Sequence, residues 1–151
     1  MRLQLALNVT DLDQAIDFYS KMFDTSPAKI KPGYANFAIE QPPLKLVLFE
    51  VGGEHPEAAD TSTGGFHHLN HLGVEVEDAT EVIAAEARIS GSGIETTGVD
   101  DAVCCFAEKT ETWVASPDAA RWEWYVKNAD ADQLEHVSVG ATAPAETCCA
   151  T

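Results

Sequence analysis

The sequence predicts an α+β fold in which two paired βαβββ modules form an incomplete barrel around a metal cleft. The first observation is a duplication, because the pattern of residues 3–18 recurs at residues 70–85 with an offset of 67 residues. The second is that each copy is an alternating strand followed by an acidic turn and a helical stretch. The third is that three strand-like runs follow each helix, which makes the repeated unit βαβββ.

Module one is expected over residues 1–51. Asp11 is the predicted N-cap of a helix that ends near Met22, since a carboxylate at this position accepts the free N–H groups of the first helical turn. The three strands expected after this helix are residues 27–30, 35–39 and 45–51. A connector rich in Gly, Pro and acidic residues, 52–66, leads to the second module.

Module two is expected over residues 67–127. Asp78 repeats the role of Asp11 and caps a helix that ends near Ile89, before a Ser-Gly-Ser-Gly stretch. The three strands expected after this helix are residues 94–97, 112–115 and 122–126. The intervening stretch 98–103, Gly-Val-Asp-Asp-Ala-Val, is expected to be a flexible loop.

Length and charge limit the class of protein. The chain of 151 residues fits one domain over residues 1–127, followed by a polar tail, 128–151, that is expected to be mostly disordered. A net charge of −16 argues against nucleic acid and anionic membranes as partners. The sequence contains no secretory leader and no apolar run of about 20 residues, so we expect a cytoplasmic protein with reduced thiols. A monomer and a homodimer both remain open.

Strand alternation predicts a metal site. Gln4 and His71 occupy equivalent positions in the two repeats, each on the strand face opposite the apolar residues. Glu123, in the Arg-Trp-Glu-Trp-Tyr-Val strand, is expected to face the same cleft because its aromatic neighbours pack on a helix. An amide, an imidazole and a carboxylate suit a divalent metal such as Fe(II). We therefore expect Gln4, His71 and Glu123 to be its ligands.

Each of these residues also has a structural interpretation. His71 could be a hydrogen-bonded histidine of the core, and Glu123 could pair with Arg121 or Lys127. Their matched placement in a duplicated frame favours the metal. The other histidines compete for the role, and His67, which has the strand parity of His71, is the weak alternative among them. These competitors are His55, His67, His68 and His136.

The second chemical feature is a pair of adjacent cysteines, Cys104 and Cys105. Adjacent cysteines seldom bond to each other because the ring that closes is strained. Two neighbouring thiols suit one soft centre, such as trivalent arsenic, if the backbone orients both sulfurs together. The alternative is a buried pair of small apolar side chains. Cys148 and Cys149, in the tail, could transfer thiophilic ions or be incidental.

These features resemble a known group of proteins. The duplicated frame, the NVTDLDQAIDFYSKMF opening and the NHLGVEVED repeat resemble the vicinal oxygen chelate superfamily of glyoxalases, bleomycin-resistance proteins and extradiol dioxygenases. The segments KPGYANFAIEQPPLKLVLFE, the double cysteine and the closing WEWY are similar to the ArsI carbon–arsenic lyases and the cadmium-induced CadI proteins. The resemblance covers roughly residues 1–127.

The resemblance implies a function and its residues. It implies Fe(II) bound by Gln4, His71 and Glu123, and a trivalent organoarsenical bound by Cys104 and Cys105. The implied reaction is oxygen-dependent cleavage of the carbon–arsenic bond, which releases inorganic arsenite from methylarsenite or aromatic arsenicals. In purified material, nickel or zinc can replace the iron.

Two other functions remain open. A cadmium- or arsenic-binding stress protein would use the same thiols without turnover. A glyoxalase-like lyase or thiol transferase would need no vicinal cysteines and would favour Glu50 as a fourth metal ligand. For the organic group of the substrate, four aromatic residues are possible pocket walls, with core packing as the alternative for most of them. These are Tyr34, Phe37, Phe106 and Trp113.

Overall fold

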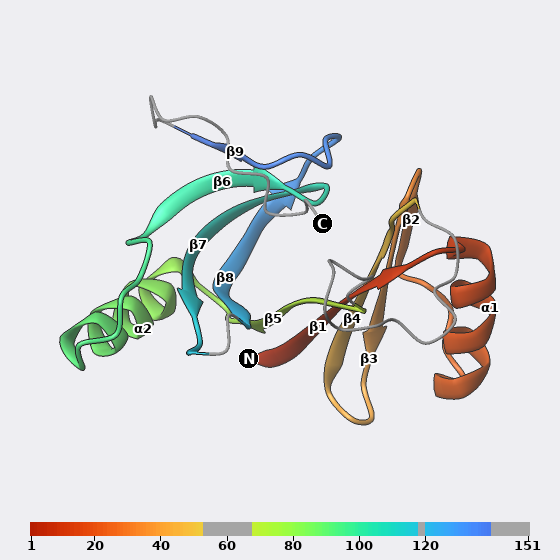
Figure 1. The fold of residues 1–151 in the computed structure, drawn as a ribbon, viewed down its shortest axis with the longest axis horizontal. Coiled ribbons are helices and arrows are strands. Elements are labelled where there is room, and N and C mark those ends of the chain that lie inside the picture. The colour runs from red at the N-terminus through yellow and green to blue at the C-terminus, as the bar shows by residue number, and fades with distance from the viewer. Residues whose placement is uncertain (53–67, 118–119, 140–151) are drawn as a thin grey trace. The chain divides into compact units, whose positions relative to one another are not determined.

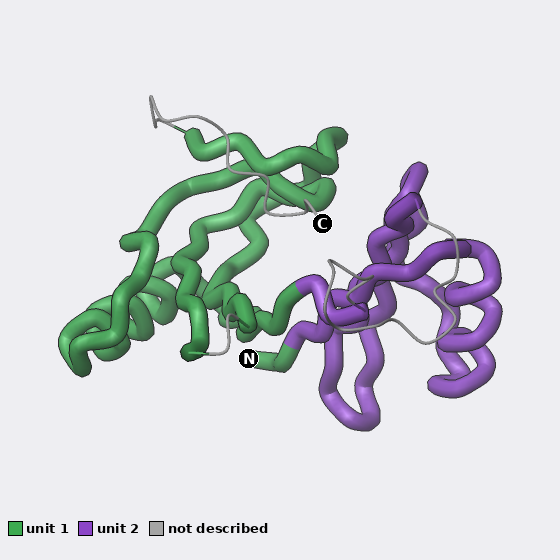
Figure 2. The backbone as a smooth tube through the Cα atoms, viewed as in Figure 1, with its two compact units in different colours: residues 1–3, 71–150 green, residues 4–70, 151 purple. Residues whose placement is uncertain are grey.

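The computed structural model divides into two compact units. It describes residues 1–52, 68–117 and 120–139 (Figure 1). Unit 2 consists of residues 4–70, and unit 1 consists of residues 1–3 and the described residues from 71 onward (Figure 2). Apart from residue 52, the expected connector lies outside the described residues.

Unit 2 has the βαβββ order that the sequence predicts. Its elements are β1 (Arg2–Val9, in this unit from Gln4 on), α1 (Leu12–Phe23), β2 (Lys29–Lys31), β3 (Tyr34–Ile39) and β4 (Leu44–Glu50). The strands are ordered β2-β3-β4-β1, and β3 pairs with both of its neighbours antiparallel. Each predicted strand of this module therefore forms, with bounds shifted by one or two residues.

Helix α1 begins where the sequence predicts. The Asp11 side chain accepts a hydrogen bond from the Gln14 N–H at 2.8 Å, and Glu50 Oε1 accepts one from the Leu12 N–H at 3.0 Å. The helix packs its apolar face on the sheet, because burying that face stabilises it far more than its own hydrogen bonds do. The buried residues of this core are Leu12, Ala35, Phe37, Ile39, Leu46 and Leu48.

Strand β1 has one buried polar face. Gln4 and Asn8 are 6% and 7% exposed, and they alternate with Leu5 and Leu7, which pack against the core of unit 2. This division of faces is the predicted one. Leu3, expected on the apolar face, is instead 55% exposed.

Unit 1 carries the second βαβββ repeat and one further strand. Its elements are β5 (Leu69–Glu75, in this unit from His71 on), α2 (Ala79–Gly91), β6 (Asp100–Cys104), β7 (Ala107–Ala115), β8 (Arg121–Asp130) and β9 (Val137–Ser138). The order is β5-β8-β7-β6-β9. Only β5 and β8 are parallel, and the other neighbours pair antiparallel. In Figure 1, β9 lies along the outer edge of β6.

Helix α2 is capped and packed like α1. The Asp78 side chain accepts hydrogen bonds from the Thr80 and Glu81 N–H groups. Val82 of α2 is fully buried in a cluster with valines of the sheet. These are Val74, Val76 and Val126. Neither these two helices nor any other helix in the described parts of the chain combines the length and apolar character that a membrane span requires.

Two predictions in the middle of module two are wrong. Residues 94–97 form no strand, and the stretch 98–103, expected to be a flexible loop, contains most of β6. Gly98, with φ of +75°, turns the chain into β6. Strand β6 then pairs with β7 along its whole length. The ladder with β7 begins only at Asp100, so the β-propensity of Ile-Glu-Thr-Thr leads to no strand.

The end of the chain also differs from the expected disordered tail. Strand β8 continues to Asp130, and β9 pairs with β6 through Val137 and Ser138. Residues 140–151, which include Cys148 and Cys149, lie outside the described residues.

We predict that Phe37→Ala lowers the free energy of unfolding by about 3–5 kcal/mol, because it leaves a cavity in the core of unit 2. Phe37 is 0% exposed. The control is Phe18→Ala, whose side chain is 59% exposed and whose loss should cost about 1 kcal/mol or less. Urea unfolding followed by circular dichroism measures both. Equal losses for the two variants would contradict the assignment of this core.

Candidate active site

Alternation in three neighbouring strands of unit 1 gathers polar side chains on one face. In the parallel pair β5/β8, Gly73 lies opposite Glu123, and His71 shares the face of Gly73 because it lies two residues away. In the antiparallel pair β7/β8, Trp113 lies opposite Glu123. The residues that share this face of β7 with Trp113 are Glu111 and Lys109.

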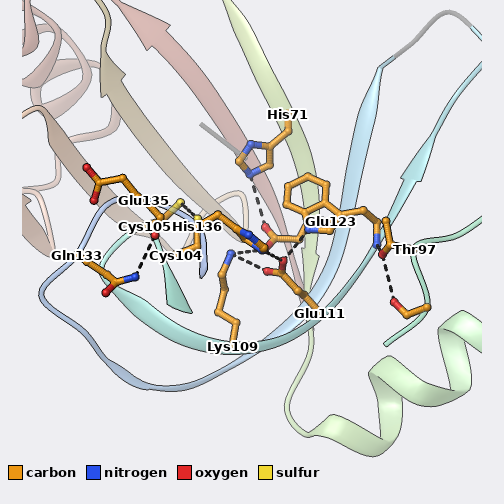
Figure 3. A network of polar contacts seen from close by, with 12 residues as sticks. His71, Thr97, Cys104, Cys105, Lys109, Glu111, Glu123, Gln133, Glu135 and His136 are labelled. Carbon is orange, nitrogen blue, oxygen red and sulfur yellow. Dashed lines mark hydrogen bonds and ion pairs between the residues drawn. The ribbon is translucent and has the colours of Figure 1, made fainter. Parts of the chain in front are cut away.

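His71 and Glu123 form a buried pair. Their Nε2 and Oε2 atoms are 3.5 Å apart, with side chains only 3% and 1% exposed (Figure 3). The ring of Trp113 stands edge-on to the His71 ring, with centroids 5.2 Å apart. A carboxylate so fully removed from water requires charged or hydrogen-bonding partners.

Lys109 supplies the positive charge in this site. Its Nζ donates a short hydrogen bond to Glu123 Oε1 and lies 3.1 Å from Glu111 Oε2 (Figure 3). Burial opposes the charge on Lys109, but the Glu123 and Glu111 carboxylates outweigh it and raise the pKa of this lysine. Burial likewise opposes ionisation of Glu123, but Lys109 and His71 hold its pKa well below the ordinary value. Both groups are therefore charged at neutral pH.

Glu111 connects this site to the segment that precedes β9. Its Oε1 accepts a hydrogen bond from Trp113 Nε1 at 2.8 Å. The same oxygen is 2.9 Å from His136 Nε2. Its Oε2 makes the ion pair with Lys109 and has no hydrogen bond in the described structure. Three side chains thus hold one buried carboxylate in place.

The two cysteines lie at a tight hairpin turn between β6 and β7. Cys104 pairs with Ala107, so the loop has two residues, Cys105 and Phe106, with φ of 57° and 60°. Positive φ at both central positions is typical of a type I′ turn, where Asn-Gly is the usual sequence. Non-glycine residues there are strained by about 1–3 kcal/mol each. The turn is thus an ordered, strained structure.

The turn brings the two sulfurs together. The Sγ atoms of Cys104 and Cys105 are 2.8 Å apart, longer than the ~2.05 Å of a disulfide, so they are not bonded to each other. Cys105 is not part of a disulfide, whereas Cys104 is disulfide-bonded in this structure. Binding of one guest by both sulfurs therefore requires Cys104 to be reduced. The hairpin turn itself places the two sulfurs near each other.

Other predicted residues belong to unit 2. Gln4 is a buried residue of β1 in that unit, and its role as a metal ligand remains a prediction. The Glu50 carboxylate accepts the Leu12 N–H at the start of α1. A helix N-terminus favours a negative charge, so Glu50 has a structural role in capping α1.

The four aromatic residues have different surroundings. Phe37 is part of the core cluster of unit 2, so core packing accounts for it. Tyr34 packs against Phe49 with ring centroids 5.6 Å apart, and its hydroxyl oxygen accepts a hydrogen bond from Asn36. Phe106 is buried in the cysteine turn, and Trp113 contacts His71. Of the four, Trp113 directly adjoins a candidate metal ligand.

Sequence reasoning missed Lys109 and Glu111 and treated His136 only as a competitor of His71. In Ala-Glu-Lys-Thr-Glu-Thr-Trp, charged residues alternate with threonines, a pattern typical of a solvent-facing strand. Burial on both faces could be recognised only once β7 was seen between β6 and β8. His55 and His67 lie outside the described residues.

The His71–Glu123 pair fits two ligands of one divalent ion. Imidazole and carboxylate are donors that Fe(II) accepts, and bonds of about 2.1 Å allow one ion to reach atoms 3.5 Å apart. Lys109 holds Oε1 of Glu123, so Oε2 is the oxygen nearer to His71. The described residues contain no group of three His, Cys, Asp or Glu side chains that could hold a metal.

The comparison with protein families matches residues 3–123 to the model of the Glyoxalase/Bleomycin resistance protein/Dioxygenase superfamily. The chain belongs to this superfamily. The resemblance inferred from the sequence is thereby confirmed, together with the α+β fold of repeated βαβββ modules.

Two relatives match most of the chain. A protein of Thermomonospora curvata named trivalent organoarsenical cleaving enzyme is 47% identical over 148 residues, which is 98% of this chain and 87% of the relative. The cadmium-induced protein CadI of Mycobacterium tuberculosis is 50% identical over 131 residues, which is 87% of this chain and 79% of the relative. These two relatives correspond to the two kinds of protein, carbon–arsenic lyases and CadI proteins, that the sequence resembles.

A solved structure supports the fold. The Mn(II)-bound glyoxalase of Novosphingobium aromaticivorans aligns with a TM-score of 0.57 at 15% identity, covering 86% of this chain and 40% of that chain. At this identity, the likeness concerns the fold alone.

We predict that Lys109→Met destabilises the metal-free protein by about 3–5 kcal/mol, because it leaves the buried carboxylates without their cation. The double variant Lys109→Met/Glu111→Gln should recover part of this loss, since one negative charge is then removed. Urea unfolding in the presence of a chelator measures both, with Lys127→Met as an exposed control. A double variant less stable than the single one would refute the electrostatic explanation.

Proposed function

We propose that this protein cleaves the carbon–arsenic bond of trivalent organoarsenicals in a reaction that depends on Fe(II) and oxygen and releases inorganic arsenite. The observation that carries the proposal is the coexistence in one unit of a buried His71–Glu123 pair and two converging cysteine sulfurs. Lys109 connects them, because it contacts Glu123 and interacts electrostatically with Cys105.

In this proposal, the sulfurs of Cys104 and Cys105 bind the arsenic. Trivalent arsenic is soft and prefers thiolates to oxygen ligands. The hairpin turn holds the two sulfurs 2.8 Å apart, so once Cys104 is reduced, one arsenic atom can replace the protons of both thiols. The positive charge of Lys109 favours the thiolate form of Cys105, since the two groups interact.

His71 and Glu123 hold the iron, with Gln4 proposed as the third ligand. Three protein ligands leave positions open at the metal, as in non-haem iron oxygenases. When bound, Fe(II) supplies the redox chemistry with molecular oxygen. The protein fixes the arsenic beside the metal, which is a proximity effect. Trp113, edge-on to His71, is the proposed wall for the organic group, either methyl or aryl.

The relatives support the reaction class. The 47% identical protein of Thermomonospora curvata is named for cleavage of trivalent organoarsenicals, and its match covers almost the whole of this chain. Transfer of that activity to this chain is part of the proposal. The iron and oxygen requirements rest on the donor set and not on the name.

A second candidate function is the binding of a thiophilic ion without turnover. The short distance between the two sulfurs favours it, because any soft ion would find the same two donors. The 50% identity with a cadmium-induced protein is consistent with it. Product formation distinguishes the two functions.

We predict that the reduced protein, loaded with Fe(II) without oxygen and given methylarsenite, forms inorganic arsenite only after air is admitted. Chromatography with arsenic-specific detection follows the products. Cys104→Ser and Cys105→Ser should each lower the rate at least about 100-fold while retaining iron. Glu108→Gln, exposed on the same hairpin, is the control. Tight binding of the arsenical without product would favour the second candidate, and fully active cysteine variants would refute the thiol role.

We predict that His71→Ala and Glu123→Gln each weaken Fe(II) binding at least tenfold, because each removes a ligand, and that Gln4→Ala weakens it as well. Anaerobic calorimetric titration measures the affinity. Glu50→Gln should bind iron normally, since the amide still accepts the Leu12 N–H and Glu50 is not a proposed ligand. A large loss in Glu50→Gln would instead favour the glyoxalase-like alternative with a fourth ligand. Unchanged affinity in Gln4→Ala would remove Gln4 from the set.

A further inference from the structure

His136 lies directly across from Cys104. Strands β6 and β9 pair antiparallel, with Ala102 opposite Ser138 and Val103 opposite Val137. One step further along this register places Cys104 opposite His136. Residues directly opposite each other in an antiparallel pair project from the same face, with Cβ atoms about 4.5–5.5 Å apart. Figure 3 draws both side chains in the same polar network.

The backbone keeps the two segments together beyond the last paired residues. The N–H groups of Cys105 and Phe106 donate to the carbonyls of Leu134 and Gln133, at 3.0 and 2.8 Å. The Cys104 Sγ is 3.8 Å from the Leu134 carbonyl oxygen. The segment that carries His136 therefore backs the whole cysteine turn.

The ring of His136 is held in one orientation. Its Nε2 is 2.9 Å from Glu111 Oε1, and an ionised carboxylate can only accept a hydrogen bond. In the neutral ring, the proton therefore resides on Nε2, and Nδ1 carries the lone pair. Nδ1 is buried and has no hydrogen-bond partner among the described residues. A carboxylate that orients an imidazole in this way prepares its other nitrogen as a base.

The other groups around the turn are less suited to accept a proton. Lys109 is held as a cation between Glu123 and Glu111. Glu111 is occupied by Lys109, Trp113 and His136. Glu135, the neighbour of His136, is exposed and has the opposite strand parity. Of these groups, His136 is the one with an accepting nitrogen, and its segment pairs with the strand that carries Cys104.

We propose that His136 carries the thiol protons when the cysteines bind a trivalent arsenical. This inference rests on the proposed function and deepens it. Nδ1 takes the proton of a thiol as its sulfur forms a bond to arsenic, and then gives this proton to the hydroxide that leaves arsenic, which departs as water. Two such exchanges join R–As(OH)₂ to both sulfurs and release two water molecules. Arsenic remains trivalent, and no oxidant or reductant is needed.

The test measures the rate of arsenical binding in the reduced, metal-free protein. Phenylarsenite is the probe, and stopped-flow tryptophan fluorescence follows association, with dissociation measured by chase with a small dithiol. His136→Gln keeps a donor for Glu111 but removes the base. We expect association to slow about 100-fold, the usual range for loss of a general base. Dissociation should slow by the same factor, because a proton carrier serves both directions, so Kd should be unchanged.

Matched variants separate this role from a structural one. Glu135→Gln, on the adjacent exposed residue, should bind at the wild-type rate. In His136→Ala, imidazole added to the buffer should restore much of the rate by occupying the vacated space. His136→Ala keeps the test valid even if His136→Gln folds poorly. The association rate is then compared within one variant, with and without added imidazole.

Distinct outcomes overturn the inference. Wild-type rates in His136→Gln, or a weakened Kd with an unchanged association rate, would show that His136 carries no proton in this step. In either case, tight phenylarsenite binding by the wild-type protein would leave the proposed function standing. Failure of the reduced wild-type protein to bind phenylarsenite would overturn the thiol role and this inference together.

Discussion

The buried ion pair between Lys109 and Glu123 is the interaction on which the candidate site depends. Without a cation beside it, a carboxyl group this far from water would be neutral, and a neutral carboxyl is a poor ligand for a metal. Lys109 keeps Glu123 ionised, and because it occupies one carboxylate oxygen, the other remains beside His71. The same ammonium pairs with Glu111, which in turn orients Trp113 and His136. One charge therefore organises side chains from several strands.

The cysteine turn shows where the sequence favours chemistry over local stability. A two-residue loop with positive φ at both positions normally takes Asn-Gly, yet here it contains Cys105 and Phe106. The strain is offset by backbone hydrogen bonds to Gln133 and Leu134 and by burial of the Phe106 side chain. Asparagine in place of Cys105 would relieve part of the strain but would remove a sulfur. The turn thus holds the two sulfurs in close proximity at a conformational cost.

Much of the fold could be predicted because its signals are local. The repeated strand–helix pattern gave both modules, Asp11 and Asp78 gave both helix starts, and alternation placed Glu123 on the face away from the helix-packed Val126. What escaped prediction depends on how strands pair in the sheet. Strand β6 lies between its hairpin partner β7 and the distant β9, and the burial of Lys109 is visible only inside that sheet. His136 offered no local signal, since its partner Glu111 lies 25 residues earlier.

The short segment after Asp130 contains no part of either repeat, yet it backs the cysteine turn and carries His136. A chain that stopped at Asp130 would still have every helix and strand of the duplicated frame. It would lack the carbonyls that hold the turn and the imidazole of the residue opposite Cys104. In the proposed function, the binding of a soft guest thus depends partly on a segment outside the duplicated frame.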